Sequence, residues 1–531
     1  MTIPRWTPSS EVGKREAFLL KRLQRTKKLF RFLREHRLDL FDDAFQDELA
    51  SMYRSTDEGK EALPPAQLAM AILLQAYTGS SDAEAIENAT VDPRWRMVLG
   101  TLSPEEEEPP FSQGTLQRFR QRMIAHDMDR RLLERSVELA KQTGGFDYKK
   151  LPKDIRLAVD SRPLTGAGRV EDTFNLLGHA ARKLLKCAAA IAEIDPSDLA
   201  ESIDVPALTA SSTKRGLDID WNDAEQKAGA IKKLTEQIDR LETWVREELG
   251  DAAERPPLSE QLATLAQLRD QDLEPDPGGG GPRIRDGVAP DRRISVEDPE
   301  MRHGRKSKSQ TIKGYKTHLG ADLDTKLILA CAVTPANKPE SDALPPIVDD
   351  LKHYPERNAI GSLHIDRGYL ASEAVRALAD DRVPIISKPW RAQASELFAK
   401  SDFEINVGRL TITCPAGETE KIRLGTVVHF PAETCDVCPK RAACTNAAPG
   451  RGRGVTIAAD ELLQKKLRRA IATPTGRDVL RDRVMIEHRL AHHARKQGPR
   501  ARYLGVRNNL FDSRRHAAAI NLENLQLAEA A

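Results

Sequence analysis

Several features that would place a chain in a class at once are scarce or absent from this 531-residue sequence. It has only 6 cysteines, too few for a disulfide scaffold in a chain of this length. No stretch approaches the ~18 uninterrupted apolar residues of a membrane-spanning helix. The first residues also lack the apolar run of a secretory signal peptide. We therefore expect a cytoplasmic protein with no membrane partner.

An excess of charge of one sign is absent as well. The 82 Lys and Arg residues nearly balance the 80 Asp and Glu residues, and the formal net charge is +2. Any attraction for nucleic acid must therefore come from local clusters of charge. At ~150 residues per domain, the length predicts three or four folding units.

The N-terminal part of the chain has the spacing of helices. Apolar residues recur at intervals of three and four, and we predict a helical N-terminal domain over residues 1–145. Ser112 is a candidate N-cap for a helix that carries Arg118 and Arg122. A role in DNA binding or assembly is the functional interpretation of this domain, and a charged surface helix is the alternative.

Short apolar runs that are typical of buried strands begin at residue 155. The runs 155–160 and 361–366 each end in an aspartate, residues 311–335 are predicted as a β-hairpin, and residues 383–389 as a further strand. Strands that alternate with helical segments predict an α/β core. We assign this core to residues 150–174 and 296–400.

Two insertions are expected to interrupt the core. Residues 175–295 contain the apolar repeat of a two-helix hairpin, and the glycine-rich segment 275–282 is predicted to be a flexible linker. Residues 401–455 are β-rich and hold four cysteines. Residues 456–531 are expected to return to the core as helices that carry a basic, DNA-contacting stretch.

Three carboxylates are the candidates for chemistry. Asp160 and Asp366 end predicted core strands, and Glu487 lies on a helix predicted over residues 478–497. Functional groups gather at the carboxyl ends of strands in α/β sheets. Carboxylates without His or Cys suit hard cations such as Mg²⁺. Two such ions ~3.5–4 Å apart can activate a water or a 3′-hydroxyl group and stabilise the leaving oxygen of a phosphodiester.

Four of the six cysteines lie close together in the sequence. Cys414, Cys435, Cys438 and Cys444 include a Cys-x₂-Cys pair, a pattern compatible with one structural Zn²⁺. The alternative is a set of reduced, partly buried cysteines that tighten the β-rich insertion.

A basic stretch surrounds the third acid. Residues 481–516 carry ten Lys or Arg residues against three acids, which favours a track that contacts the DNA backbone over a merely solvated basic face. The candidate DNA-contacting residues are Arg483, Arg495, Lys496, Arg500, Arg502, Arg507, Arg514 and Arg515.

Longer segments carry a family resemblance. AVDSRPLTGAGRVEDTFNLL, GYKTHLGADLDTKLILACAVTPAN, LHIDRGYL, CPAG, CDVCPKRAAC and RDRVMIEHRLAHHARKQG follow one another in this order. Together they resemble blocks of bacterial insertion-sequence transposases of the DDE type, whose catalytic core is ribonuclease-H-like. The resemblance covers the chain from about residue 60 to about residue 525.

The resemblance implies a reaction, cofactors and partners. Asp160, Asp366 and Glu487 would be the three acids, holding two Mg²⁺ or Mn²⁺ ions. The implied activity is cleavage at transposon ends followed by strand transfer from the freed 3′-hydroxyl. The implied partners are double-stranded DNA (terminal inverted repeats and target) and a second copy of the chain, as a homodimer in the DNA complex. A nuclease that only hydrolyses and a non-catalytic DNA-binding derivative are the two alternatives.

Overall fold

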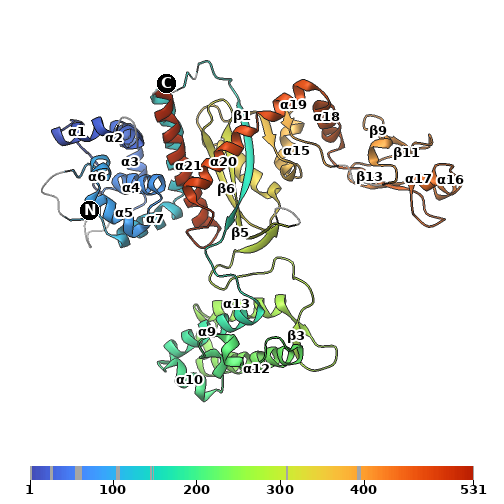
Figure 1. Cartoon of the computed structure of the whole chain (residues 1–531), viewed down its shortest axis with the longest axis horizontal. Coiled ribbons are helices and arrows are strands. Elements are labelled where there is room, and N and C mark those ends of the chain that lie inside the picture. Colours follow the sequence, from blue (N-terminus) through green and yellow to red (C-terminus); the bar gives the residue numbers. More distant parts are fainter. Residues whose placement is uncertain are drawn as a thin grey trace.

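The computed structural model describes residues 3–23, 28–53, 62–102, 108–143, 146–147, 149–305, 309–391 and 396–529. A mixed sheet lies at the centre, with the N-terminal helices on one side of it (Figure 1). A helical bundle projects from one end of the sheet, and a slender arm extends on the side opposite the N-terminal helices. Among the described helices, none combines the length and apolar character needed to span a bilayer.

The described part of the N-terminal region is helical, as predicted. Ser81 and Glu84 form a capping box, Ser112 caps the helix that carries Arg118, and Gly79 ends another helix in the left-handed conformation (φ 73°). The helices are α1 (Lys14–Arg22), α2 (Lys28–Leu40), α3 (Asp43–Ala50), α4 (Pro65–Thr78), α5 (Asp82–Val91), α6 (Pro93–Leu99), α7 (Gln113–Ala125) and α8 (Met128–Gln142).

The central sheet has six strands and joins segments from across the chain. The order is β4–β5–β1–β7–β8, and β6 pairs with β5. β1 is antiparallel to β5 and parallel to β7, and β7 is parallel to β8. The strands are β1 (Ile155–Thr165), β4 (Arg302–Arg305), β5 (Thr311–Asp322), β6 (Ile328–Pro335), β7 (Ile360–Ile365) and β8 (Ile385–Ile386).

The predicted hairpin is present, but β1 is longer than its apolar run. β5 and β6 form the hairpin, and the Asp322 carboxylate accepts from the Thr325 hydroxyl in the turn. β1 does not end at Asp160, because the long β5 continues to pair with it as far as Thr165. The parallel partner β7 does end at Ile365. Asp160 therefore lies inside a strand, at the point where its parallel neighbour stops.

One long helix joins the sheet to the N-terminal helices. α21 (Val506–Glu529) packs against β6 on one side and against α4 and α8 on the other. The Asn521 side chain accepts from the backbone N–H of Ile328 and donates to its carbonyl oxygen, which ties the helix to β6. Residues 511–520 are all buried. Shorter elements around the sheet are η3 (Glu340–Ala343), α14 (Leu344–Leu351), η4 (Arg367–Tyr369) and α15 (Glu373–Asp380).

The bundle holds the predicted two-helix hairpin and has a hydrophobic core of its own. The glycine-rich segment expected to be a flexible linker instead forms the turn of a short hairpin, because Leu273–Pro275 pairs with Pro282–Ile284. The elements are α9 (Thr173–Ala192), α10 (Pro196–Ser202), η1 (Pro206–Leu208), α11 (Thr213–Leu217), α12 (Ala224–Leu249), η2 (Gly250–Ala252), α13 (Leu258–Asp272), β2 (Leu273–Pro275) and β3 (Pro282–Ile284).

The arm is β-rich and carries the cysteines, as predicted. Its strands form two small antiparallel sheets, β11–β10–β9 and β12–β13. Its elements are η5 (Lys400–Asp402), β9 (Glu404–Asn406), β10 (Thr411–Thr413), β11 (Thr419–Lys421), β12 (Val427–His429), α16 (Ala432–Asp436), α17 (Arg441–Cys444) and β13 (Gly454–Thr456).

The chain returns to the core through three helices, α18 (Glu461–Ala472), α19 (Pro474–Arg481) and α20 (Val484–Gln497). The single helix predicted over residues 478–497 is wrong in this respect, because α19 ends before Asp482 and α20 begins at Val484. The backbone changes direction between the two helices, which brings Arg483 towards β1.

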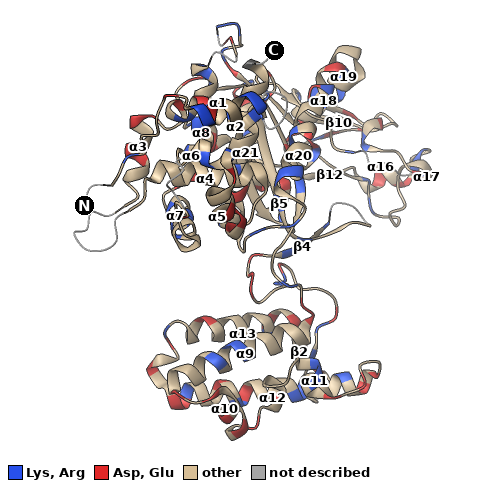
Figure 2. Cartoon of the chain, turned by 60° about the vertical axis from the view of Figure 1, so that its left-hand side comes forward, with Lys and Arg blue, Asp and Glu red and all other residues tan. Residues whose placement is uncertain are grey.

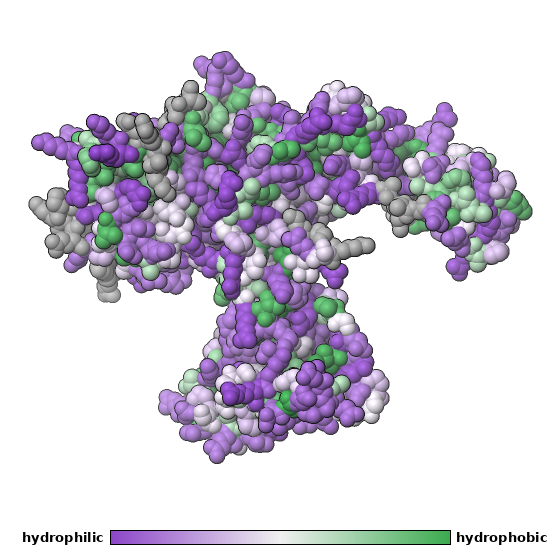
Figure 3. Space-filling model, in the orientation of Figure 1, coloured by the Kyte–Doolittle hydropathy of each residue, from purple (hydrophilic) through white to green (hydrophobic). Residues whose placement is uncertain are grey.

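Positive and negative residues are mixed along the chain. Lys and Arg residues alternate with Asp and Glu residues on the N-terminal helices, the bundle and the arm (Figure 2). The face seen in Figure 3 is mostly hydrophilic, with scattered apolar patches. This distribution agrees with the near-zero net charge of the sequence.

Candidate active site

The register of two parallel strands places two of the predicted acids side by side. Val159 of β1 pairs with Ile365 of β7, so Asp160 and Asp366 follow at neighbouring positions. Adjacent strands lie ~4.8 Å apart. The apolar residues before each aspartate are buried on both faces of the sheet, which fixes the register, and the carboxylates stand where that buried segment ends.

Glu487 joins these aspartates through α20, which packs against β1. Arg483 connects the two elements: its Nη1 donates to Asp160 Oδ2 at 3.0 Å, and its Nη2 donates to Glu487 Oε1 at 3.1 Å. Asp160, Asp366 and Glu487 line one open groove of about 790 Å³. Arg483, predicted to contact DNA, lies inside the acid cluster in this structure.

A fourth carboxylate, Glu340, was not predicted from the sequence. Glu340 begins η3, lines the same groove and accepts a hydrogen bond from the Ser161 hydroxyl. Its other carboxylate oxygen lies against Gly368, where a Cβ atom would have no room. Gly368 follows Asp366 by two residues. Glu340 therefore contacts Ser161, which follows Asp160, and Gly368, in the turn that follows Asp366.

The cluster perturbs the ionisation of Asp160. Burial raises the pKa of Asp160 to about 6, and the negative charges of Asp366 and Glu340 add to the increase. The backbone N–H of Ser161 and the Arg483 guanidinium act in the opposite direction. A carboxylate held among other carboxylates in this way is a common feature of functional sites.

The groove also has basic walls. Arg162, Arg305 and Lys316 line it together with the acids. The Lys316 ammonium group donates to the carbonyl oxygen of Lys338 at 2.7 Å, and burial lowers the pKa of Lys316. A groove lined by both carboxylates and cations suits a polyanion whose phosphates are held while one of them reacts.

The carboxylate oxygens of this cluster are the ligand type that Mg²⁺ and Mn²⁺ prefer. Within the described ranges, no group of three or more His, Cys, Asp or Glu side chains already converges with metal-site geometry. Arg483 lies between Asp160 and Glu487 and supplies positive charge there.

Two of the predicted DNA-contacting arginines are buried, and this part of the prediction is corrected. Arg514 is 5% exposed and Arg515 is fully buried. Arg514 pairs with Asp129 and Asp350, and Arg515 donates to Asp512 at 2.6 Å. Both lie on α21, between the sheet and the N-terminal helices, where carboxylates of the protein neutralise them.

Other members of the basic stretch also have partners inside the protein. Lys496 pairs with Glu523 at 2.8 Å, Arg507 pairs with Asp129, and Arg502 donates to the carbonyl oxygen of Ser80 at 2.6 Å. Arg495 and Arg500 are exposed to solvent. The basic stretch therefore divides into residues that join α20 and α21 to the N-terminal helices and a smaller exposed set.

The helix predicted to carry Arg118 and Arg122 is α7, and it exposes only part of its positive charge. Arg118 is exposed, whereas the Arg122 guanidinium lies over the Tyr53 ring, 4.4 Å from its centroid. Between them, Arg120 is buried and pairs with Asp82 at 2.6 Å. The accessible charge of this helix is therefore smaller than its sequence suggests.

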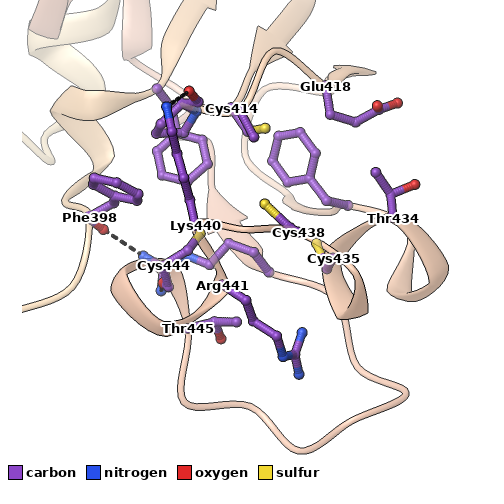
Figure 4. Close-up of a pocket in the computed structure, with 15 residues that line it drawn as sticks. Phe398, Cys414, Glu418, Thr434, Cys435, Cys438, Lys440, Arg441, Cys444 and Thr445 are labelled. Carbon is purple, nitrogen blue, oxygen red and sulfur yellow. Dashed lines mark hydrogen bonds between the residues drawn. The ribbon is translucent and has the colours of Figure 1, made fainter.

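The four cysteines of the arm line one pocket, where their side chains lie around a common space (Figure 4). All four are free and partly exposed. Burial raises the pKa of the Cys444 thiol, and the nearby thiols of Cys435, Cys414 and Cys438 raise it further. The structure thus collects residues that are up to thirty positions apart in the sequence.

Two parts of the chain match known protein families. Residues 20–122 match a family model described as a transposase domain (DUF772), and residues 409–526 match one described as a transposase DDE domain. The chain is therefore a transposase. It carries a DDE domain, which implies a ribonuclease-H-like core and agrees with the mixed central sheet.

The matched ranges include Glu487 but not Asp160 or Asp366. No curated protein and no solved structure matches the chain. The grouping of the three acids therefore depends on the strand register and on the packing of α20.

Proposed function

We propose that this transposase cleaves DNA at transposon ends and joins the freed 3′-hydroxyl to target DNA by two-metal phosphoryl transfer. The observation that carries the proposal is the register of β1 and β7, which sets Asp160 beside Asp366 in the groove that Glu487 also lines. Three carboxylates that line one groove together with cations suit phosphodiester chemistry.

Asp160, Asp366 and Glu487 would hold the divalent ions, Mg²⁺ or Mn²⁺. Bound there, such ions supply Lewis acidity and lower the pKa of an attacking water or hydroxyl. The chain supplies the rest of the site. The strand register and α20 fix the carboxylates, Glu340 orients the Ser161 side of the cluster, and Arg305 and Lys316, which line the groove, would bind phosphates of the DNA.

Double-stranded DNA is the proposed partner, both as terminal inverted repeats and as target, and the proposed active assembly is a homodimer. Exposed cations near the groove support backbone contacts: Arg305 lines it, Arg495 lies on α20, and Arg500 follows that helix. Phosphate contacts of this kind position DNA without reading its sequence. Arg118 and Arg122 of α7 are proposed to contact bases, as part of an N-terminal domain within residues 1–145.

The arm, within residues 401–455, is proposed to hold one structural Zn²⁺. Its four cysteines line a single pocket next to the side chains of Phe398, Phe403 and Phe430. Thiolates are the ligands that a closed tetrahedral zinc site prefers. Zinc bound there would stabilise the arm and take no part in the reaction.

The test is a cleavage and joining assay on a supercoiled plasmid that carries the terminal repeats. With Mg²⁺, we expect Asp160→Asn, Asp366→Asn and Glu487→Gln each to abolish nicking while DNA binding changes little, because affinity comes mainly from phosphate contacts elsewhere. Glu236→Gln, an exposed acid of α12 in the bundle, is the matched control and should retain full activity.

The products distinguish the proposal from its alternatives. Strand-transfer products together with nicked ends support transposition, whereas nicked ends without joined strands would identify an enzyme that only hydrolyses. Binding without either product would identify a non-catalytic derivative. A normal cleavage rate in any one of the three acid variants would remove that acid from the site.

A further inference from the structure

A buried tyrosine lies behind the acid cluster. Tyr369 ends η4, the turn that begins directly after Asp366, and its backbone N–H donates to the carbonyl oxygen of Asp366 at 3.1 Å. The Tyr369 side chain is fully buried. A buried hydroxyl group needs a polar partner, because leaving it unpaired costs free energy. The partners of this hydroxyl come from two neighbouring strands of the sheet.

One partner is a buried histidine of β5. The Tyr369 hydroxyl lies 2.7 Å from His318 Nδ1, and His318 Nε2 lies 3.0 Å from the Thr334 hydroxyl of β6. Burial and, to a smaller extent, the nearby Lys316 ammonium group lower the pKa of His318 to about 3. The imidazole ring is therefore neutral at physiological pH and carries a single N–H.

The other partner belongs to the acid cluster. The Tyr369 hydroxyl lies within hydrogen-bonding reach of the Ser161 hydroxyl, and the Ser161 hydroxyl donates to Glu340 Oε1. Ser161 directly follows Asp160 in β1. The Tyr369 hydroxyl therefore connects the turn after one aspartate with the residue after the other, and through that residue with Glu340.

The direction of each hydrogen bond follows from the number of hydrogen atoms. Because Ser161 donates its hydroxyl hydrogen to Glu340, its oxygen accepts from the Tyr369 hydroxyl. The Tyr369 oxygen then accepts from His318 Nδ1–H, and the unprotonated His318 Nε2 accepts from the Thr334 hydroxyl. This placement gives every donor an acceptor. All four donors in the series from Thr334 to Glu340 thus point towards the carboxylate.

From this geometry we infer that Tyr369 is a positioning residue of the acid cluster, which keeps the Ser161 hydroxyl directed at Glu340 and holds the turn after Asp366 against β1. Hydrogen bonds in series polarise one another, so the bond that reaches Glu340 depends on the whole series. Groups that orient metal ligands in this way strengthen metal binding. The inference deepens the proposed function and rests on it for the divalent ion that the cluster would hold.

The experiment is a titration of the full chain with Mn²⁺, followed by electron paramagnetic resonance of the free ion. Tyr369→Phe removes the hydroxyl and keeps the ring, and we expect roughly tenfold weaker Mn²⁺ binding. Tyr354→Phe is the matched control, because its hydroxyl is also buried and donates to the carbonyl oxygen of Leu329 at 2.8 Å. Each variant loses one buried hydrogen bond, but Tyr354→Phe should keep the wild-type Mn²⁺ affinity.

A double variant tests whether Tyr369 acts through Ser161. Ser161→Ala alone should weaken Mn²⁺ binding by a similar factor of roughly ten. Adding Tyr369→Phe to Ser161→Ala should then weaken it little further, because effects that pass through a shared partner do not add. Effects that multiply in the double variant would show that the two hydroxyls act independently and would contradict the series.

The histidine supplies a spectroscopic signature of the same series. In ¹⁵N spectra of histidine-labelled protein, His318 should be neutral with its hydrogen on Nδ1 down to about pH 5, and its signals are identified by their loss in His318→Gln. In Tyr369→Phe the Nδ1–H loses its acceptor, and we expect a shift of the hydrogen towards Nε2.

Two results would overturn the inference and leave the proposed function in place. These are a wild-type Mn²⁺ affinity in Tyr369→Phe and a wild-type His318 with its hydrogen on Nε2. Failure of the proposed function would look different, because a wild-type chain that binds no Mn²⁺ would remove the metal site itself, and the role of Tyr369 with it.

Discussion

Arg483 and the carboxylates around it determine the balance of charge in the groove when no divalent ion is bound. Carboxylates that share a site repel one another, and the Arg483 guanidinium offsets part of that repulsion by pairing with Asp160 and Glu487. The same oxygen atoms are those that a divalent cation would need. At the proposed metal site, Arg483 and a divalent ion would therefore compete for these oxygen atoms, in addition to the DNA contact predicted for Arg483 from the sequence.

Replacing Glu340 tests its place in the cluster. Because Glu340 lies against Ser161 and the turn after Asp366, we expect Glu340→Gln to weaken Mn²⁺ binding by about 10–100-fold, the usual effect of losing a group that orients metal ligands. Electron paramagnetic resonance of free Mn²⁺ measures this directly.

The controls for Glu340 separate metal binding from folding. Glu340→Asp should recover part of the affinity, and Glu236→Gln should leave it unchanged, with all variants unfolding at similar urea concentrations. Equal Mn²⁺ affinity in wild type and Glu340→Gln would exclude Glu340 from the cluster.

The raised pKa of Asp160 predicts a gain in stability when its charge is removed. The pKa lies at about 6 in the folded chain, above its ordinary value of 3.8, so the ionised form disfavours folding and the wild type loses stability as pH rises from about 4 to 6. Asp160→Asn should therefore raise the free energy of unfolding by about 1–3 kcal/mol at pH 8. The gain should disappear near pH 4.

Urea unfolding in EDTA at several pH values measures this effect. Glu236→Gln is again the control and should follow the wild type. A stability difference that stays constant between pH 4 and pH 8 would show that Asp160 titrates normally.

At the scale of elements, α21 depends on a buried ion pair. Burial alone would raise the pKa of Asp512, but the charges of Arg515 and His516 and a hydrogen bond from Gln497 hold it well below its ordinary value. Asp512 thus stabilises the fold at pH values above its unfolded pKa, and this contribution is lost as pH falls below about 4.

Removing one partner of this pair should be costly. Asp512→Ala leaves the Arg515 guanidinium buried without its carboxylate, and we expect a loss of about 3–5 kcal/mol. Asp512→Asn should lose less and should show a weaker fall in stability below pH 4. Thermal unfolding followed by circular dichroism reports both. Asp349→Asn, an exposed acid of α14, is the control, and an Asp512→Ala variant as stable as this control would contradict the pairing.

The elements that the sequence predicted well are those with a clear local pattern. The hairpin of β5 and β6 has buried strands and a turn fixed by Asp322 and Thr325. The apolar strand residues and the polar turn residues can both be recognised in the sequence. Residues 456–531 were expected to be helical, but the burial of α21 was missed because its buried face carries Arg514, Arg515 and Asn521, which resemble surface residues until their partners from distant segments are known.

Some residues of the candidate site could be predicted from the sequence and others could not. Asp160 and Asp366 could be selected because each follows an apolar run, but only the register of β1 and β7 sets them side by side. Glu340 lies in a short turn with no periodic pattern, so nothing local distinguishes it from a surface acid. Its contact with Ser161 joins residues 179 positions apart.

At the scale of the whole molecule, the two projecting lobes differ in how they can be stable. The bundle has an extensive core of its own. The buried core of the described part of the arm is small and consists of Phe403, Ile412, Ile422, Val428, Phe430, Val455 and Ile457. A core this small seldom stabilises a fold without a metal ion or a disulfide. The pocket of four cysteines lies beside it.

We therefore expect one zinc per chain on elemental analysis of the purified protein. Cys438→Ser should lose the metal and make the arm more sensitive to trypsin, because metal binding contributes folding free energy. Cys187→Ser, in α9 of the bundle, should retain the zinc. Protein without zinc whose arm resists protease equally with and without a strong chelator would contradict this prediction.

The packing of α21 also affects how the chain folds during synthesis. The apolar faces of α4 and α8 are covered by a helix that the ribosome makes only after the bundle, the strands of the sheet and the arm. Until then the first helices lack this partner. A product shortened by a frameshift before α21 would leave these faces bare and be cleared by proteases. Mutations that shift the reading frame anywhere upstream of α21 should thus silence the protein completely.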